Sequence, residues 1–241
     1  SDVYKRQFVH RAQAMCYAYI FALQNNMETI GIQMTYCNLE TEQTKYFREE
    51  FSFEEIKKWF DDLMEEYGKW ATFQCEMKNQ RQASIKELNF PYEYRPGQKK
   101  LVSDVYRTIM RQKLLFMQAP TGVGKTISTI FPAVKAVGEE LADRIFYLTA
   151  KTITATVAKE TFALLEKNGY RAKTIQITAK EKLCPCDEME CNPVTCPYAK
   201  GHFDRVNDAV FDLLHRCEMI ERDDILSQAD RYTVCPFELC L

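Results

Sequence analysis

Two groups of side chains in this chain have the types and spacing that chemistry requires. The first is a glycine-rich loop, Ala119-Pro-Thr-Gly-Val-Gly-Lys-Thr126, which follows an apolar run and precedes a helical pattern. Such a loop can aim successive backbone N–H groups at one phosphate, with a lysine for the terminal phosphates and a hydroxyl for Mg²⁺. A chance glycine-rich turn is the alternative. We expect a bound nucleotide and Mg²⁺, held by Thr121, Gly122, Val123, Gly124, Lys125 and Thr126.

The second group is a set of cysteines downstream of this loop. Its members are Cys184, Cys186, Cys191, Cys196, Cys235 and Cys240. Four thiolates from one segment can hold an iron-sulfur cluster or a zinc ion. Tight Cys-x2-Cys pairs are absent, and none of the three histidines lies in the run 184–196, so the irregular spacing favours a cluster over zinc. Zinc, or no metal, remains the alternative. Cys16, Cys37 and Cys217 are scattered and are expected to be ordinary core residues.

Composition sets limits on partners and compartment. The 241 residues are 46% hydrophobic, which suffices for about one and a half to two domains. The net charge is only -2, so a nucleic-acid partner would need a local basic groove. No apolar run is long enough to span a membrane and no secretory signal is present, so we expect a cytoplasmic protein in a reducing compartment.

Patterning divides the chain into four parts. In residues 1–76 we expect a helix over 8–24 with Phe8, Met15 and Ile20 on its apolar face, then paired strands at 31–36 and 44–51. A helix capped by Ser52 and Glu55 follows, and residues 77–89 form a linker.

Residues 90–180 alternate helices and strands. The expected helices cover 98–109, 125–141 and 153–167, and the expected strands 113–118, 144–150 and 173–178. This order predicts an α/β fold, a parallel sheet with helices on its faces. Residues 181–241 form an inserted cysteine domain with an amphipathic helix between Cys196 and Cys235.

The run from Phe90 to Leu241 resembles a known family. Phe90-Pro-Tyr-Glu-Tyr, the glycine-rich loop, Tyr147-Leu-Thr-Ala-Lys151, Lys182-Leu-Cys184, Cys196-Pro-Tyr and Val234-Cys-Pro-Phe237 are similar to the XPD/DinG type of superfamily 2 iron-sulfur DNA helicase. The resemblance implies a P-loop (RecA-like) motor domain, ATP-driven 5'-to-3' movement in DNA repair or replication, and a [4Fe-4S] cluster. Residue by residue, it assigns Lys125 and Thr126 to ATP–Mg²⁺ catalysis, and Cys184, Cys191, Cys196 and Cys235 to the cluster. Cys186 and Cys240 are surplus, and Cys184 against Cys186 as the first ligand stays open.

The same resemblance suggests further contacts with the nucleotide and with DNA. Gln98 stands where such helicases read the adenine edge, with Tyr92 or Tyr94 stacking on the ring; the alternative is a solvated glutamine at a helix start. Thr149, Lys151 and Thr152 match the place where the DNA backbone is held, although Thr152 could simply cap a helix. A basic, aromatic edge for single-stranded or forked DNA is expected from Lys180, Lys182, Lys200, Arg205, Arg216, Tyr198 and Phe203, with surface charge as the alternative.

The front of the chain carries a weaker resemblance. Gln13 and Tyr17 form a Gln-x3-Tyr pattern similar to the C-terminal part of a RecB-like PD-(D/E)XK nuclease domain, here a partial α/β domain. An amphipathic helix with Tyr17 packed inside is the alternative. Residues 1–7 look non-native, and the metal-binding acids of that family are missing, so no DNA cleavage is expected.

We expect the chain to be a monomeric fragment of the larger helicase, lacking the acidic Walker B motif and therefore nearly inactive in hydrolysis by itself. The rival interpretation is a non-motor P-loop module that binds nucleic acid and is stabilised by zinc.

Overall fold

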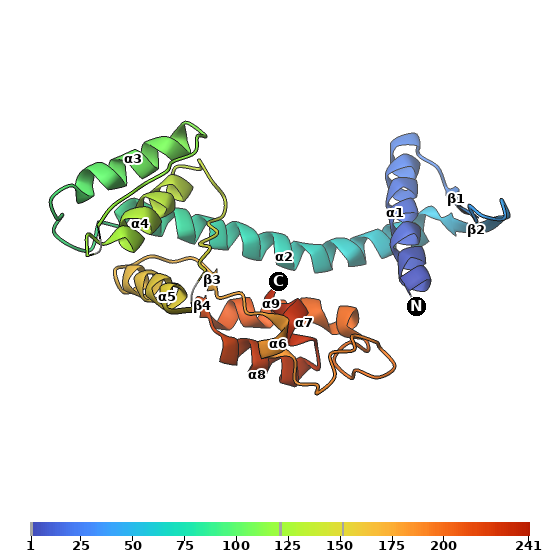
Figure 1. Ribbon diagram of the computed structural model, residues 1–241. Coiled ribbons are helices and arrows are strands. Elements are labelled where there is room, and N and C mark those ends of the chain that lie inside the picture. The colour runs from blue at the N-terminus through green and yellow to red at the C-terminus, as the bar shows by residue number, and fades with distance from the viewer. Residues whose placement is uncertain (1, 121, 151) are drawn as a thin grey trace. The chain divides into compact units, whose positions relative to one another are not determined.

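The computed structural model describes residues 2–120, 122–150 and 152–241, and the chain divides into two compact units, Ser1–Gln74 and Cys75–Leu241. The long helix α2, Phe53–Glu87, begins in the first unit and ends in the second (Figure 1). Between Ile56 and Ile85 this helix buries none of its residues. The two units therefore have separate hydrophobic cores.

The first unit packs helix α1 and the start of α2 against a hairpin. Helix α1 covers Asp2–Asn25, and strands β1, Thr29–Cys37, and β2, Thr44–Ser52, pair antiparallel in the register Thr29↔Ser52. Ser52 and Glu55 form the predicted capping box, with the Ser52 hydroxyl 2.7 Å from Glu55 Oε2. The helix, the two strands and the capping box are confirmed.

The buried face of α1 differs from the predicted one. Met15, Ala18 and Ala22 are buried, whereas Phe8 and Ile20 are exposed. Small alanines at one-turn spacing let β1 approach α1 closely, and Ile30 and Ile32 of β1 fill the contact. The apolar pattern was right for Met15 and wrong for Phe8 and Ile20, because it weighted large side chains over the small alanines.

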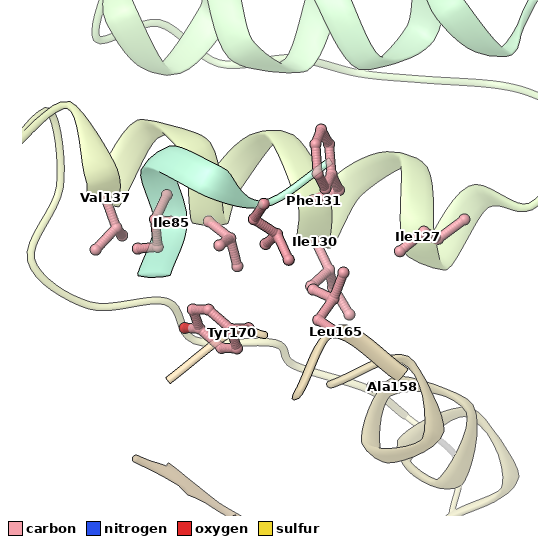
Figure 2. Packing of buried hydrophobic residues seen from close by; sticks show 10 residues of the cluster. Ile85, Ile127, Ile130, Phe131, Val137, Ala158, Leu165 and Tyr170 are labelled. Carbon is pink, nitrogen blue, oxygen red and sulfur yellow. The ribbon is translucent and has the colours of Figure 1, made fainter. Parts of the chain in front are cut away.

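The second unit begins inside α2, where a linker was expected. Residues 77–87 are helical, and Ile85 and Leu88 are buried in a core with α4, Lys125–Gly138, and α5, Thr152–Lys167 (Figure 2). The Lys135 ammonium donates to the carbonyls of Ile85, at 2.7 Å, and Leu88, at 3.1 Å, and so caps the end of α2. Only the last turn of this segment is buried, so its sequence is mostly polar and lacks the apolar periodicity from which a helix is predicted.

Two expected strands carry no β-ladder among the described residues. In 113–118 the side chains of Leu114 and Phe116 are almost fully exposed. In 144–150 burial alternates: Ile145 and Tyr147 pack against the core while Phe146 and Leu148 face outward. That alternation has the period of a strand with one buried face. The parallel P-loop sheet stays a prediction.

The cysteine region is helical and has its own core. It contains α6, Lys180–Leu183, α7, His202–Arg216, α8, Arg222–Tyr232, and α9, Pro236–Cys240. Strands β3, Thr174–Ile175, and β4, Met219–Ile220, pair in parallel. The predicted helix between Cys196 and Cys235 is confirmed as α7, with Ala209 and Leu213 buried, although Phe203 at its start is exposed.

Candidate phosphate-binding loop and cysteine cluster

The glycine-rich loop leads into α4 through two glycines in the left-handed region. Gly122 has φ 87° and Gly124 has φ 74°, and Gly124 is the N-cap of α4. An L-residue with a side chain pays strain in this region, so the two glycines fit their positions. The α4 N-terminus, which has no side-chain cap, follows at once and provides an electropositive end for an anion.

Carbonyl oxygens of this loop accept hydrogen bonds from side chains and backbone groups of the protein itself. Lys125 Nζ lies 2.8 Å from the Ala119 oxygen and 3.2 Å from that of Pro120. The Gly124 carbonyl accepts from the backbone N–H and the hydroxyl of Ser128 in α4. Lys125 therefore lies folded over its own loop, and a bound phosphate would draw it away from these carbonyls. Thr126 is half-buried in the first turn of α4, and Thr121 lies outside the described residues.

Gln98 opens helix α3, Gln98–Met110, and is bound to the loop rather than to solvent. Its side chain is 4% exposed. The amide Nε2 donates to the Val123 carbonyl at 3.1 Å, and Oε1 accepts from the Arg95 N–H at 3.1 Å. The alternative of a solvated Gln98 is therefore wrong. Both polar ends of the expected adenine-reading residue have backbone partners.

Of the two tyrosines that precede Gln98, Tyr94 stacks on another ring and Tyr92 is the more exposed. Tyr94 stacks on Phe90 with ring centroids 4.3 Å apart, and Phe90 meets Phe131 of α4 edge to face. Tyr92 is more exposed than Tyr94. Tyr92 is thus the aromatic more available to a ligand, because the ring of Tyr94 already has a partner.

Cys186 has two other cysteines as neighbours, Cys196 and Cys184. The sulfurs of Cys186 and Cys196 are 3.9 Å apart. Burial, the hydrogen bond to Cys196 and the nearby thiol of Cys184 raise the pKa of Cys186 to about 11. Cys186, surplus in the sequence prediction, therefore lies beside the predicted ligand Cys196.

Three cysteines lie near Lys180 of α6. Its pKa is raised by a hydrogen bond to Cys191, and further by the charges of Cys235 and Cys184. Cys191 is exposed, and Cys235 is the N-cap of α9. No three His, Cys, Asp or Glu side chains of the described residues are close enough together to hold a metal ion. The donor types fit a thiolate-bound metal, and their loops would have to close further around it.

Two further residues near the proposed ligands are His202, which was not predicted to matter, and Cys240, which the sequence left surplus. His202 is buried, and its Nδ1 lies 3.1 Å from the backbone N–H of Cys235, which ties the start of α7 to that cysteine. The only sequence signal for it is its position after Gly201. Cys240 is buried, with its sulfur 3.8 Å from the Gln176 carbonyl, and so belongs to the core rather than to the exposed thiols.

A hollow of about 280 Å³ lies beside the cysteines. Its lining is Lys182, Leu183, Cys184, Pro185, Tyr198, Arg222, Leu226, Ala229, Asp230 and Pro236. The Tyr198 hydroxyl donates to Asp230 at 2.9 Å, and this bond is the first cause of the raised pKa of Tyr198. Cationic side chains and one carboxylate thus share its rim.

The expected DNA contacts divide into two kinds. Lys182 and Lys200 are exposed, whereas Arg205 donates to the carbonyls of Tyr232 and Thr233, and Arg216 bonds to Asp212. These two guanidinium groups already bind groups of the protein, although Arg216 is exposed, and the sequence could not show these bonds. For the backbone-gripping set, Thr149 is half-buried, Thr152 begins α5, and Lys151 lies outside the described residues.

In the first unit, Gln13 Nε2 lies 3.3 Å from the Tyr17 hydroxyl on α1. Tyr17 is 65% exposed, so the alternative that packed it inside is wrong. Its ring lines an apolar hollow of about 530 Å³ between α1 and β1.

No family model, curated protein or solved structure matches this chain. Within the described ranges, no helix has the length and apolarity needed to cross a membrane.

Proposed function

We propose that this chain is part of an ATP-dependent, iron-sulfur DNA helicase, with the glycine-rich loop as its nucleotide site. The observation that carries the proposal is the loop itself: two left-handed glycines, a lysine and a threonine at the start of α4. Backbone N–H groups at a helix N-terminus suit a polyphosphate, and Lys125 is the proposed contact to the terminal phosphates. Thr126 supplies the hydroxyl for Mg²⁺.

The cysteines Cys184, Cys191, Cys196 and Cys235 are the proposed ligands of a [4Fe-4S] cluster. Their support is that Cys184, Cys191 and Cys235 all lie near the side chain of Lys180, and that the sulfur of Cys196 is 3.9 Å from that of Cys186, two residues after Cys184. A bound cluster would hold these loops together and supply a redox-active centre. The chain's own residues then keep the loops in place, with His202 fixing Cys235 through its backbone.

Single-stranded or forked DNA is the proposed substrate, moved 5' to 3'. Exposed Lys182 and Lys200 beside the cysteines suit backbone phosphates, and exposed Phe203 suits a stacked base. The proposed contacts to the backbone of the DNA strand, at the start of α5, are Thr149, Lys151 and Thr152. Such contacts bind the backbone without reading sequence.

The nucleotide proposal is tested by titrating the protein with a fluorescent ADP analogue. We expect saturable, Mg²⁺-dependent binding, weakened at least about tenfold by Lys125→Ala because a charge-assisted contact to phosphate is lost. Lys99→Ala, which removes an exposed lysine of α3, is the matched control and should bind as the wild type does. Absence of saturable binding, or equal affinity of the Lys125 variant, would contradict the proposal.

The metal proposal is tested by measuring iron, acid-labile sulfide and zinc in protein purified without oxygen. About four irons and four sulfides per chain are expected, with visible colour. Cys191→Ser or Cys235→Ser should lower both contents, whereas Cys16→Ser, on α1 in the other unit, should not. A colourless, iron-free and well-folded protein would remove the cluster from the proposal.

A second candidate function is a non-motor nucleic-acid-binding module with a zinc site, and one distance favours it. Two sulfurs on one tetrahedral Zn²⁺ lie about 3.8 Å apart, since Zn–S is about 2.3 Å. Cys186 and Cys196 are 3.9 Å apart. If this candidate holds, one zinc per chain will be found and Cys186→Ser will remove it. In the helicase proposal Cys186→Ser keeps the iron.

A further inference from the structure

Two consecutive carbonyls of the phosphate loop are bound by one short upstream segment. The Arg95 guanidinium donates to the Gly122 carbonyl, and Gln98 Nε2 donates to the Val123 carbonyl at 3.1 Å. The two donors are also joined to each other, because the Arg95 N–H donates to Gln98 Oε1 at 3.1 Å. The segment 95–98 therefore holds two neighbouring peptide groups of the loop at once.

Holding these carbonyls also fixes the amides that follow them. In a planar trans peptide, the C=O of one residue and the N–H of the next point in opposite directions. Fixing the Gly122 carbonyl toward Arg95 therefore turns the Val123 N–H to the opposite side, and fixing the Val123 carbonyl toward Gln98 does the same for the Gly124 N–H. Successive N–H groups facing away from the protein segment that holds them are what a phosphate requires.

We propose that Arg95 and Gln98 are positioning residues that act together as a brace on the phosphate loop, and that Gln98 does not read the base. The inference deepens the proposed nucleotide site and rests on it. It assigns both side chains to phosphate affinity, through the orientation of the Val123 and Gly124 amides. It also means that Gln98 does not select the base of the nucleotide, since both ends of its amide are already bound to backbone groups.

The packing around Gln98 leaves it little freedom to turn toward a base. The side chain is 4% exposed, and a Cβ placed on Gly124 would lie 2.7 Å from Gln98 Nε2. Glycine at this position lets the loop backbone approach the amide closely. Releasing Gln98 would leave a buried amide and the Val123 carbonyl without their bonds, which is costly inside a protein.

The test compares ligands with and without a base. Wild type, Arg95→Ala, Arg95→Lys and Gln98→Ala are assayed for ADP, GDP and inorganic pyrophosphate by competition against a fluorescent nucleotide. If the brace orients the loop, each alanine variant weakens its binding of all three ligands by one common factor. This factor is about tenfold or more for Arg95→Ala, which loses a charged hydrogen bond, and up to about tenfold for Gln98→Ala, which loses a neutral one. The ADP-to-GDP ratio stays unchanged, and Arg95→Lys recovers part of the affinity because it keeps one cationic donor. Lys99→Ala is the control.

A different pattern would overturn the proposal. If Gln98 reads the base, Gln98→Ala will change the ADP-to-GDP ratio and leave pyrophosphate binding unaffected. If the residues are merely structural, Arg95→Lys will give no recovery and circular dichroism will show unfolding in step with lost affinity. Either result ends the brace interpretation.

A readout without nucleotide separates this proposal from the proposed function. The chain has only 8 glycines, so selective ¹⁵N-glycine labelling gives a short amide spectrum. Arg95→Ala and Gln98→Ala should move the Gly122 and Gly124 signals of the nucleotide-free protein and leave Gly31 and Gly68 in place. Unmoved loop signals would refute the brace, whereas wild type that binds no nucleotide would refute only the proposed function.

Discussion

Gly169 and Gly124 both have a positive φ but very different surroundings. The angle φ is 99° at Gly169, just after α5, and 74° at Gly124. Open space surrounds the position of a Cβ on Gly169, whereas a Cβ on Gly124 would meet the Gln98 amide. The pair therefore separates backbone strain from the contact between Gly124 and Gln98.

At the residue scale, we predict that Gly124→Ala and Gly169→Ala both lower the free energy of unfolding by about 1–2 kcal/mol, the cost of an L-residue with a side chain at positive φ. Only Gly124→Ala should also weaken ADP binding, because it displaces Gln98 from the Val123 carbonyl. Urea unfolding and fluorescence titration measure the two effects. Equal ADP affinities in the two variants would show that the Gly124 contact is unimportant for the loop.

At the scale of elements, α4 packs its last turn directly against the end of α2. A Cβ on Gly138 would lie 2.3 Å from Ile85 Cγ2, and Ile85 is buried and β-branched (Figure 2). Ile85 therefore has little room to move away. Lys135 strengthens the same junction by capping α2.

We predict that Gly138→Ala destabilises the protein by about 1–3 kcal/mol, as expected for overpacking a core contact. Gly68→Ala is the control, because it makes the same change inside α2 at a position with nothing within 4 Å. It should stabilise by about 0.5–1 kcal/mol through helix propensity alone. Thermal unfolding followed by circular dichroism distinguishes them, and a stabilising Gly138→Ala would disprove the packing argument.

A carboxylate joins the two longer helices of the cysteine region. Asp212 of α7 accepts from Gln228 and Arg231 of α8, each at 2.9 Å, and from Arg216. The hydrogen bond from buried Gln228 comes first among the causes that lower the pKa of Asp212, with the two arginines adding to it. The ionised form is thus favoured in the folded state.

This bond gives a pH prediction. Because the folded pKa lies below the unfolded value of about 3.9, Asp212 contributes stability above that value and loses it as the pH falls through the folded pKa. Asp212→Asn should therefore be less stable than wild type at neutral pH, with the difference shrinking below about pH 4. Asp208→Asn, an exposed position on the same helix, should show no such convergence in urea unfolding measured across pH.

At the scale of the whole molecule, the two tryptophans report on one unit only. Trp59 and Trp70 both lie in α2 within Ser1–Gln74, while the phosphate loop and the cysteines lie in Cys75–Leu241. Since α2 buries no residue between Ile56 and Ile85, little core packing is shared.

We predict that ADP–Mg²⁺ at a hundredfold excess over its Kd stabilises the second unit by about 2.7 kcal/mol and leaves the first unchanged. Heating followed by circular dichroism should then show a shifted transition, while tryptophan fluorescence keeps its midpoint. Removal of bound metal should likewise shift only the transition followed by circular dichroism. Equal shifts in both signals would show that α2 couples the units.

Much of the local structure could be predicted from the sequence. The Ser52–Glu55 cap, the hairpin of β1 and β2, and helices α3, α4, α5 and α7 follow from periodicity and capping residues close together in the chain. Helices α6, α8 and α9 were not predicted, because α6 and α9 are only 4 and 5 residues long and the sequence of α8 is mostly polar. The linker prediction missed the end of α2, where burial begins only at Ile85.

The sequence by itself determined which reactive groups the chain carries. These are a glycine-rich loop whose glycines take left-handed angles, and a set of thiols downstream. Tertiary structure alone decided which groups meet, such as Gln98 on Val123, Arg95 on Gly122 and Cys186 beside Cys196. Backbone angles and caps depend on near neighbours in the chain. Contacts between distant segments depend on how cores pack, which no short stretch of sequence encodes.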